Sequence, residues 1–280
     1  MATALSVIIP ANNEAAFIDD CLRAVLASED LPNEDAVQII VVPNGCSDST
    51  ADKARHFAQV FADRGWQLDV EERAEGDKLA ALDAGDALAG AANRAYLDAD
   101  VIVSPQLLRA TCLGLASDQP RYATGRVHLK PATRVVTQLY GRFYRQVPFI
   151  TQPAPGCGFF AVNGQGRARW AQWPRIISDD TFARLSFAPH ERVEVAASYQ
   201  WPLVEGFANL IKVRRRQNAG VAQIAAMFPE LLNNDGKPRF GGAEVMRAIA
   251  KAPLGFVVYA AVSAVVKLTP GTASDWRRGR

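Results

Sequence analysis

Two aspartates, Asp98 and Asp100, flank a single alanine in the segment AYLDADVIVSP. The residues before them, 93–97, read as a short buried strand, and apolar residues follow. In an extended backbone residues i and i+2 point to the same side, so the two carboxylates would project together. Like charges this close repel unless a cation lies between them or one is protonated. The pair therefore predicts a site for Mg²⁺ or Mn²⁺, and a solvated turn at the end of a strand is the alternative.

A second acidic pair, Asp179 and Asp180, stands ahead of an apolar helical stretch in ISDDTFARLSF. Acidic residues are favoured near a helix N-terminus, so helix capping is one interpretation. A carboxylate beside a substrate can also accept a proton from an attacking hydroxyl. The two interpretations are compatible, because a helix start is a rigid place for a general base.

The elements that would position these residues alternate along the first hundred residues. Apolar runs predict strands over residues 5–9, 37–42, 67–70 and 93–97, and helical spacing predicts helices over 14–28, 44–65 and 77–88. This order indicates an α/β fold with a doubly wound, mostly parallel sheet flanked by helices. In such sheets ligands bind at the carboxyl ends of the strands, where residues 10–14, 43–48 and 98–100 would meet.

The composition is that of a globular protein with a sizeable core. The chain has 280 residues, of which 49% are hydrophobic and 21% charged. A net charge of +2 is too small to favour a nucleic-acid partner. The four cysteines (Cys21, Cys46, Cys112 and Cys157) have no metal-binding spacing, which favours reduced thiols in the cytoplasm, and the N-terminus does not read as a signal peptide.

Five segments, SVIIPANNEAAFIDDCLRAVLAS, IIVVPNGCSDSTADKA, GDKLAALDAG, YLDADVIVSP and ISDDTFARLSF, occur in the order seen in family 2 glycosyltransferases with the GT-A fold. The resemblance spans about residues 5–217. It implies an inverting enzyme that uses Mg²⁺ or Mn²⁺ to move a sugar from a nucleotide-sugar to an acceptor hydroxyl. It also implies that Asp100 binds the metal directly, that Asp98 contacts the metal or the ribose, and that Asp180, next to Asp179, is the base.

The donor side is also implied by this resemblance. Its predicted residues are Pro10, Ala11, Asn12, Glu14, Asn44, Asp48, Lys78, Asp98, Arg214 and Arg216. Asn12 stands where the family usually has an aromatic residue, and Pro43 where many members have an acid that reads the base. The nucleotide is therefore left unassigned. For Asp48, capping of the second helix is the alternative.

The resemblance also implies an acceptor side at Gly156, Cys157 and Gly158, where the family has a glycine-rich segment beside the sugar. Glycines let the backbone approach a ligand closely, and an ordinary turn before a strand is the alternative. Trp170 and Trp173 could stack on a sugar or lie in the core. The arginine-rich stretch KVRRRQNAG, which contains Arg214 and Arg216, has a counterpart in the family. It lacks the tryptophan that follows it in polysaccharide synthases, so transfer of a single sugar is favoured over polymerisation.

The predicted division of the chain is a nucleotide-sugar-binding half (1–104), an acceptor-binding half (105–217) and a C-terminal helical tail (218–280). Within the tail, APLGFVVYAAVSAVV carries no charge but is too short to span a bilayer. It predicts either contact with a membrane surface, to which DWRRGR would contribute, or a docking helix. Surface attachment at the cytoplasmic face would suit a lipid-linked acceptor in exopolysaccharide or cell-envelope assembly. A sugar-phosphate nucleotidyltransferase and a catalytically silent scaffold in a membrane complex are the alternative functions.

Overall fold

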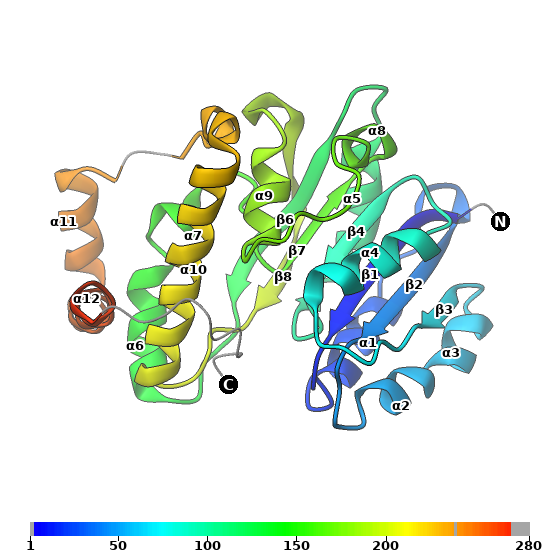
Figure 1. Cartoon of the computed structure of the whole chain (residues 1–280), viewed down its shortest axis with the longest axis horizontal. Helices are drawn as coiled ribbons and strands as arrows, with labels where there is room; N and C mark the ends of the chain where they lie inside the picture. Colours follow the sequence, from blue (N-terminus) through cyan, green and yellow to red (C-terminus); the bar gives the residue numbers. More distant parts are fainter. Residues whose placement is uncertain (1–2, 238–239, 270–280) are drawn as a thin grey trace. The chain divides into compact units, whose positions relative to one another are not determined.

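The computed structural model describes residues 3–237 and 240–269 (Figure 1). The chain divides into two compact units. Unit 1 contains the described residues up to His128 together with Gly156–Arg175 and Ser186–Trp201. Unit 2 contains Leu129–Pro155, Ile176–Leu185 and the described residues from Pro202 onward, so the predicted tail belongs to a larger body. The predicted functional division at residues 104 and 217 stays a prediction.

Within the described residues, one sheet of eight strands runs in the order β3-β2-β1-β4-β7-β6-β8-β5. The strands are β1 (Thr3–Ala11), β2 (Ala36–Pro43), β3 (Gln67–Val70), β4 (Arg94–Leu97), β5 (Ile102–Val103), β6 (Tyr122–Leu129), β7 (Phe159–Val162) and β8 (Arg192–Trp201). The four strands expected from the sequence are all present, and β1 is longer than expected.

The sheet is parallel in one half and antiparallel in the other. β1 pairs in parallel with β2 and β4, and β2 with β3. β7 runs antiparallel to β4 and β6, and β5 antiparallel to β8. The prediction of a mostly parallel sheet is therefore correct only for the first four strands. The antiparallel pairing of Leu97 with Phe159 brings the start of β7 to the carboxyl end of β4.

The helices of unit 1 pack on this sheet. They are α1 (Ile18–Leu26), α2 (Thr50–Arg55), α3 (Ala58–Asp63), α4 (Lys78–Leu88), α5 (Leu107–Leu115) and the single turn α8 (Gly164–Arg167), with short 3₁₀ turns η1 (Pro32–Glu34) and η2 (Pro189–Glu191). The helix expected over 44–65 is in fact two, α2 and α3, which are separated at His56 and Phe57.

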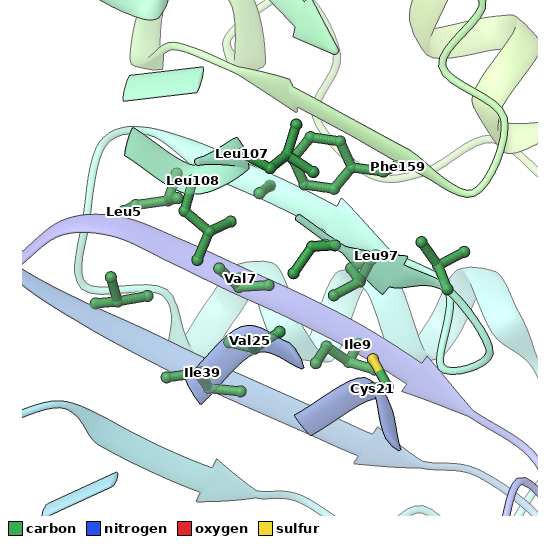
Figure 2. Packing of buried hydrophobic residues seen from close by; sticks show 14 of the residues in the cluster. Leu5, Val7, Ile9, Cys21, Val25, Ile39, Leu97, Leu107, Leu108 and Phe159 are labelled. Carbon is green, nitrogen blue, oxygen red and sulfur yellow. The ribbon is translucent and has the colours of Figure 1, made fainter. Parts of the chain in front are cut away.

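The core of unit 1 follows from the alternation of side chains along β1. Val7 and Ile9 are wholly buried in a cluster with Cys21 and Val25 of α1 (Figure 2). Residues on the other face of the strand meet α4, where a Cβ on Gly85 would come within 2.4 Å of Ile8. Each fully buried aliphatic side chain contributes about 1.5–3 kcal/mol, so this core holds the carboxyl edge of the sheet in a fixed place.

Unit 2 is built from α6 (Val135–Tyr144), α7 (Pro148–Thr151), α9 (Asp179–Leu185), α10 (Phe207–Met227), η3 (Pro229–Asn234), α11 (Gly242–Lys251) and α12 (Pro253–Leu268). α12 lies against α6 and α10 (Figure 1). The close approach of α12 to α6 requires Gly255, since a Cβ there would lie 2.5 Å from the carbonyl oxygen of Leu139. The ring of Phe143 packs on those of Phe256 and Tyr259, at centroid distances of 5.3 and 4.9 Å.

Candidate active site at the carboxyl edge of the sheet

Asp98 follows β4 directly and forms an ion pair with Lys78, the first residue of α4. The Lys78 Nζ lies 3.0 Å from Asp98 Oδ1, and the two side chains are 28% and 36% exposed. Asp77 fixes the start of α4, because its Oδ1 accepts hydrogen bonds from the N–H groups of Leu79 (2.9 Å) and Ala80 (3.1 Å). An ion pair this exposed contributes at most about 1 kcal/mol, so Lys78 can exchange its carboxylate partner for a phosphate oxygen at little cost.

Asp100 lies in a turn after Asp98. The N–H of Val101 donates to the carbonyl of Asp98 at 3.1 Å, so the backbone turns here and is not extended as the sequence suggested. Burial raises the pKa of the Cys21 thiol, and the negative charges of Asp100 and Asp98 raise that pKa further. The Cys21 sulfur lies 3.9 Å from the carbonyl oxygen of Asp98, so α1 contacts this turn. The two aspartates share one turn after β4, and their joint binding of a metal stays a prediction.

The predicted glycine segment meets the same edge. The carbonyl of Gly158 accepts a hydrogen bond from the N–H of Asp98 at 2.9 Å. Gly158 has a φ of +77°, and a Cβ there would lie 2.6 Å from the indole of Trp201 and 2.8 Å from Val101. Cys157 between the glycines is buried, and Gly156 has a φ of +71°. The structure thus brings Gly158 to the backbone of Asp98, and the contact of residues 156–158 with an acceptor stays a prediction.

Trp201, which the sequence analysis did not single out, is the last residue of β8 and is half-buried. Its indole packs against Gly158, beside the backbone that holds Asp98. Only the long-range pairing of the antiparallel strands brings these residues together, so no local pattern could have found it.

The predicted donor residues Pro10 and Ala11 end β1, and Asn12 and Glu14 lie in the loop that follows. This loop is hydrogen-bonded to the segment after β2. The Asn12 amide donates to the carbonyls of Asn44 and Gly45. The backbone N–H groups of Glu14 and Ala15 donate to Thr50 Oγ1 (2.8 Å) and Asp48 Oδ2 (3.1 Å). Glu14 is 4% exposed. These contacts give the rim of the sheet a fixed backbone shape.

Asn44 and Asp48, both predicted to bind the donor, hold the end of β1 and the loop after it in place. Asn44 is completely buried, and its Nδ2 donates to the carbonyls of Ala11 (2.9 Å) and Val42 (3.2 Å), which joins the ends of β1 and β2. Partial burial raises the pKa of Asp48, but hydrogen bonds from Thr50 and Ala15 bring it below its ordinary value. The structure gives both residues structural partners, and their contact with a donor stays a prediction.

Asp179 and Asp180 are the first two residues of α9 in unit 2. Asp179 is 7% exposed. Asp180 is half-buried, and its Oδ1 accepts hydrogen bonds from the N–H (2.6 Å) and hydroxyl (3.3 Å) of Thr181. The other end of α9 is held by Arg184, which is 3% exposed and donates to the side chain (3.2 Å) and carbonyl (2.8 Å) of Asp235. The helix that carries Asp180 is therefore anchored within its own unit.

Arg214 and Arg216 of α10 have different surroundings. The Arg214 guanidinium lies 5.3 Å from the ring centroid of Tyr259. This contact joins α10 to α12, and the contact of Arg214 with a donor stays a prediction. Arg216 is exposed on the same helix.

Trp170 and Trp173 belong to the core of unit 1. They are 8% and 3% exposed, and their rings pack at a centroid distance of 5.2 Å. The indole N–H of Trp173 donates to Asp86 at 2.9 Å. Stacking of these rings on a sugar is therefore excluded in this arrangement, and the core alternative is correct.

The donor atoms at the end of β4 fit a hard cation. Among the described residues, no group of three or more His, Cys, Asp or Glu side chains is arranged to hold a metal ion. Mg²⁺, however, usually takes only one or two protein carboxylates and completes its shell with water and substrate phosphates. Asp98 and Asp100 supply such a pair.

A parallel half-sheet with an acidic pair and a lysine at its carboxyl edge, joined to an antiparallel half, is the architecture of a GT-A glycosyltransferase. The chain belongs to glycosyl transferase family 2, whose model matches residues 6–184. It is therefore a glycosyltransferase. The family match includes both acidic pairs and ends before Arg214 and Arg216.

Solved structures have a similar fold. The mannosyltransferase PcManGT from Pyrobaculum calidifontis, in complex with GDP-Man and Mn²⁺, has a TM-score of 0.61 at 16% identity, with 97% of this chain and 77% of that chain covered. Residues 1–349 of S. aureus TarS with UDP give 0.52 at 11% identity, covering 99% and 95%. Glucosyl-3-phosphoglycerate synthase from Mycobacterium tuberculosis with Mg²⁺ and UDP gives 0.52 at 18%, covering 85% and 82%. No match was found among curated proteins.

Proposed function

We propose that this chain is an inverting, metal-dependent glycosyltransferase that moves a sugar from a nucleoside-diphosphate donor to an acceptor hydroxyl. The observation that carries the proposal is the ion pair of Lys78 with Asp98 at the carboxyl end of β4, with Asp100 in the turn that follows. Two acids and one exchangeable lysine suit a cation and a diphosphate, which bind at this edge of doubly wound sheets.

On the donor side, Asp98 and Asp100 would hold Mg²⁺ or Mn²⁺, and Lys78 would donate to a phosphate oxygen. The bound ion would neutralise the charge that builds up on the departing nucleoside diphosphate. PcManGT with Mn²⁺ and glucosyl-3-phosphoglycerate synthase with Mg²⁺ support the choice of cation. One of these proteins binds GDP-Man and the other UDP, so the nucleotide of this chain stays open.

On the acceptor side, we assign Asp180 as the general base. Its carboxylate would take the proton of the acceptor hydroxyl while that oxygen bonds to the anomeric carbon from the face opposite the diphosphate. The bond from the anomeric carbon to the phosphate oxygen breaks in the same step, which inverts the configuration. Gly156–Gly158 would border the transferred sugar, since Gly158 is bonded to the backbone of Asp98.

The acceptor is a carbohydrate or a lipid-linked precursor in this proposal, and the enzyme works at the cytoplasmic face of a membrane. The support is α12 of unit 2, an apolar helix with one exposed face.

A sugar-phosphate nucleotidyltransferase is a weaker candidate. It would need a loop after β1 whose backbone N–H groups face a phosphate. Here the N–H groups of Asn13, Glu14 and Ala15 all donate to side chains of the neighbouring loop.

The proposal is tested with a panel of UDP-, GDP- and dTDP-sugars, with Mn²⁺ or chelator present. We expect one nucleotide to bind in a metal-dependent way and its sugar donor to release nucleoside diphosphate slowly to water, faster with an acceptor. Release of pyrophosphate from a nucleoside triphosphate and a sugar phosphate would identify the nucleotidyltransferase instead. Failure to bind any nucleotide-sugar would identify a silent scaffold.

Replacing Lys78 by methionine is expected to change two affinities in opposite directions. When the Lys78 ammonium group is removed, the acidic pair should bind Mn²⁺ up to about fivefold more tightly. This factor corresponds to the free energy of one exposed ion pair. The nucleoside diphosphate, which loses a charged donor, binds about tenfold more weakly. Calorimetry with Mn²⁺ alone and with UDP and GDP measures both changes.

Lys237→Met is the matched control, because Lys237 pairs with Asp235 at 3.5 Å and the pair is similarly exposed (36% and 34%). This variant should leave both affinities unchanged. A parallel loss of metal and nucleotide binding in Lys78→Met would mean that Lys78 only holds the fold of the rim.

A further inference from the structure

One face of α12 is apolar and is not covered by other described residues of the chain. Gly255 and Val262 are buried against unit 2, whereas Leu254, Val257 and Leu268 on the other side are 66%, 62% and 79% exposed. Together with Ala261 and Ala264, these three residues recur at intervals of three and four, so they form one continuous stripe along the helix. Exposed apolar residues on this scale mark an interaction surface.

The adjoining helix α11 also exposes an apolar side chain and carries positive charge. Met246 of α11 is 65% exposed. Between residues 242 and 268 the basic residues are Arg247, Lys251 and Lys267, and the acidic residue is Glu244. We call the exposed stripe of α12, Met246 and these three basic residues the α11–α12 surface.

The length of these helices limits how the surface could meet a bilayer. Within residues 3–237 and 240–269, no single helix is long and apolar enough to cross a membrane. α11 and α12 qualify only as a pair, with a bend of 119° between them. α12 is already packed against α6 along its other side, which leaves one face for lipid. A helix with one apolar face and flanking lysine or arginine side chains lies in the bilayer interface.

We propose that the α11–α12 surface binds the interface of an anionic lipid bilayer, with Leu254, Val257 and Leu268 among the acyl chains and Arg247, Lys251 and Lys267 at the headgroups. The surface has a net positive charge, which complements anionic headgroups. A second copy of the chain is a poorer occupant. A two-fold contact would bring two sets of three basic residues together, with only Glu244 of each copy to offset them.

The test is co-sedimentation of the full chain with vesicles of phosphatidylcholine alone or mixed equally with phosphatidylglycerol. We expect binding to the mixed vesicles that weakens as salt is raised. A variant with Leu254, Val257 and Leu268 changed to serine should bind at least about tenfold more weakly, because affinity follows buried apolar area. A variant with Arg247, Lys251 and Lys267 changed to glutamine should lose its preference for the anionic vesicles.

Matched controls come from unit 1. Val60, Leu88 and Leu113 are 45%, 43% and 57% exposed, and their change to serine should leave binding as in the parent chain. A variant with the exposed arginines Arg55, Arg109 and Arg126 changed to glutamine should keep the parent chain's preference for anionic vesicles. Circular dichroism and nucleotide binding verify that each variant is folded.

Binding that survives the triple serine change, or no binding by the parent chain, overturns the proposal. A dimer seen by sedimentation velocity that the same change disrupts, without vesicle binding, would instead assign the surface to a second copy. The inference rests on the proposed function for its setting at a membrane. Vesicle binding requires no sugar transfer, however, so either proposal can fail while the other holds.

Discussion

Replacing Asp180 by asparagine is expected to lower sugar transfer by about 10²–10⁴-fold, the usual contribution of a general base. Asparagine keeps the shape of the side chain and the oxygen that accepts hydrogen bonds from Thr181, but it cannot take a proton from the acceptor. Donor binding should be nearly unchanged. The measurements are kcat for nucleoside diphosphate release with the donor found in the panel, and the Kd of that nucleotide.

A matched control separates base catalysis from helix capping. Asp52 is an exposed acidic residue in the first turn of α2, as Asp180 is in the first turn of α9. If Asp180 only stabilises a helix start, Asp180→Asn and Asp52→Asn will have similarly small effects on kcat. Equal losses of nucleotide binding and transfer in Asp180→Asn would also contradict the assignment, since they indicate a disturbed fold.

The first four strands of the sheet were predictable because their signal is local. Buried parallel strands are continuous apolar runs, and turn and cap residues separate them from helices with 3.6-residue periodicity. β3 was found at its exact bounds, and β4 within one residue. The same order of elements was enough to place residues 10–14, 43–48 and 98–100 at one edge, since parallel strands end on the same side, whereas Lys78 was predicted there from the family resemblance.

The second half of the sheet was not predictable in this way. β6, β7 and β8 form antiparallel pairs between segments far apart in the chain, and their order in the sheet does not follow their order in the sequence. Local periodicity contains no information on which distant strands pair. The contact of Trp201 with Gly158 depends on that pairing, and it was missed for this reason.

Residue type and position in the sequence also do not distinguish a side chain that binds a ligand from one that holds the fold together. Asn44, Asp48 and Arg214 are polar residues predicted to bind the donor, and each has partners within its own unit: two strand ends, a neighbouring loop and the ring of Tyr259. A buried polar group must be hydrogen-bonded wherever it lies. In this way the amide N–H groups of the fully buried Asn44 are taken by two carbonyls of the protein, which only the three-dimensional contacts reveal.

Replacing Asp100 by alanine is expected to abolish the dependence on metal together with the activity. Asp98 is already paired with Lys78, so removal of Asp100 leaves the turn after β4 with one carboxylate whose charge is offset by a lysine. A divalent ion then has little net negative charge to bind. Affinity for Mn²⁺ should fall by about 100-fold or more, beyond the roughly 10–100-fold cost of losing an outer-shell partner of a metal ligand.

Titration calorimetry with Mn²⁺ and transfer assays in Mn²⁺ and in chelator check this prediction. Asp118→Asn, at an exposed carboxylate between α5 and β6, is the control and should behave as the parent chain. The prediction depends on charge balance and not on one ligand bond. The double variant Asp100→Ala, Lys78→Met should therefore regain part of the Mn²⁺ affinity, because the charge of Asp98 is then no longer offset by the lysine. If Asp100→Ala alone keeps full turnover in chelator, the acidic pair holds no ion during transfer.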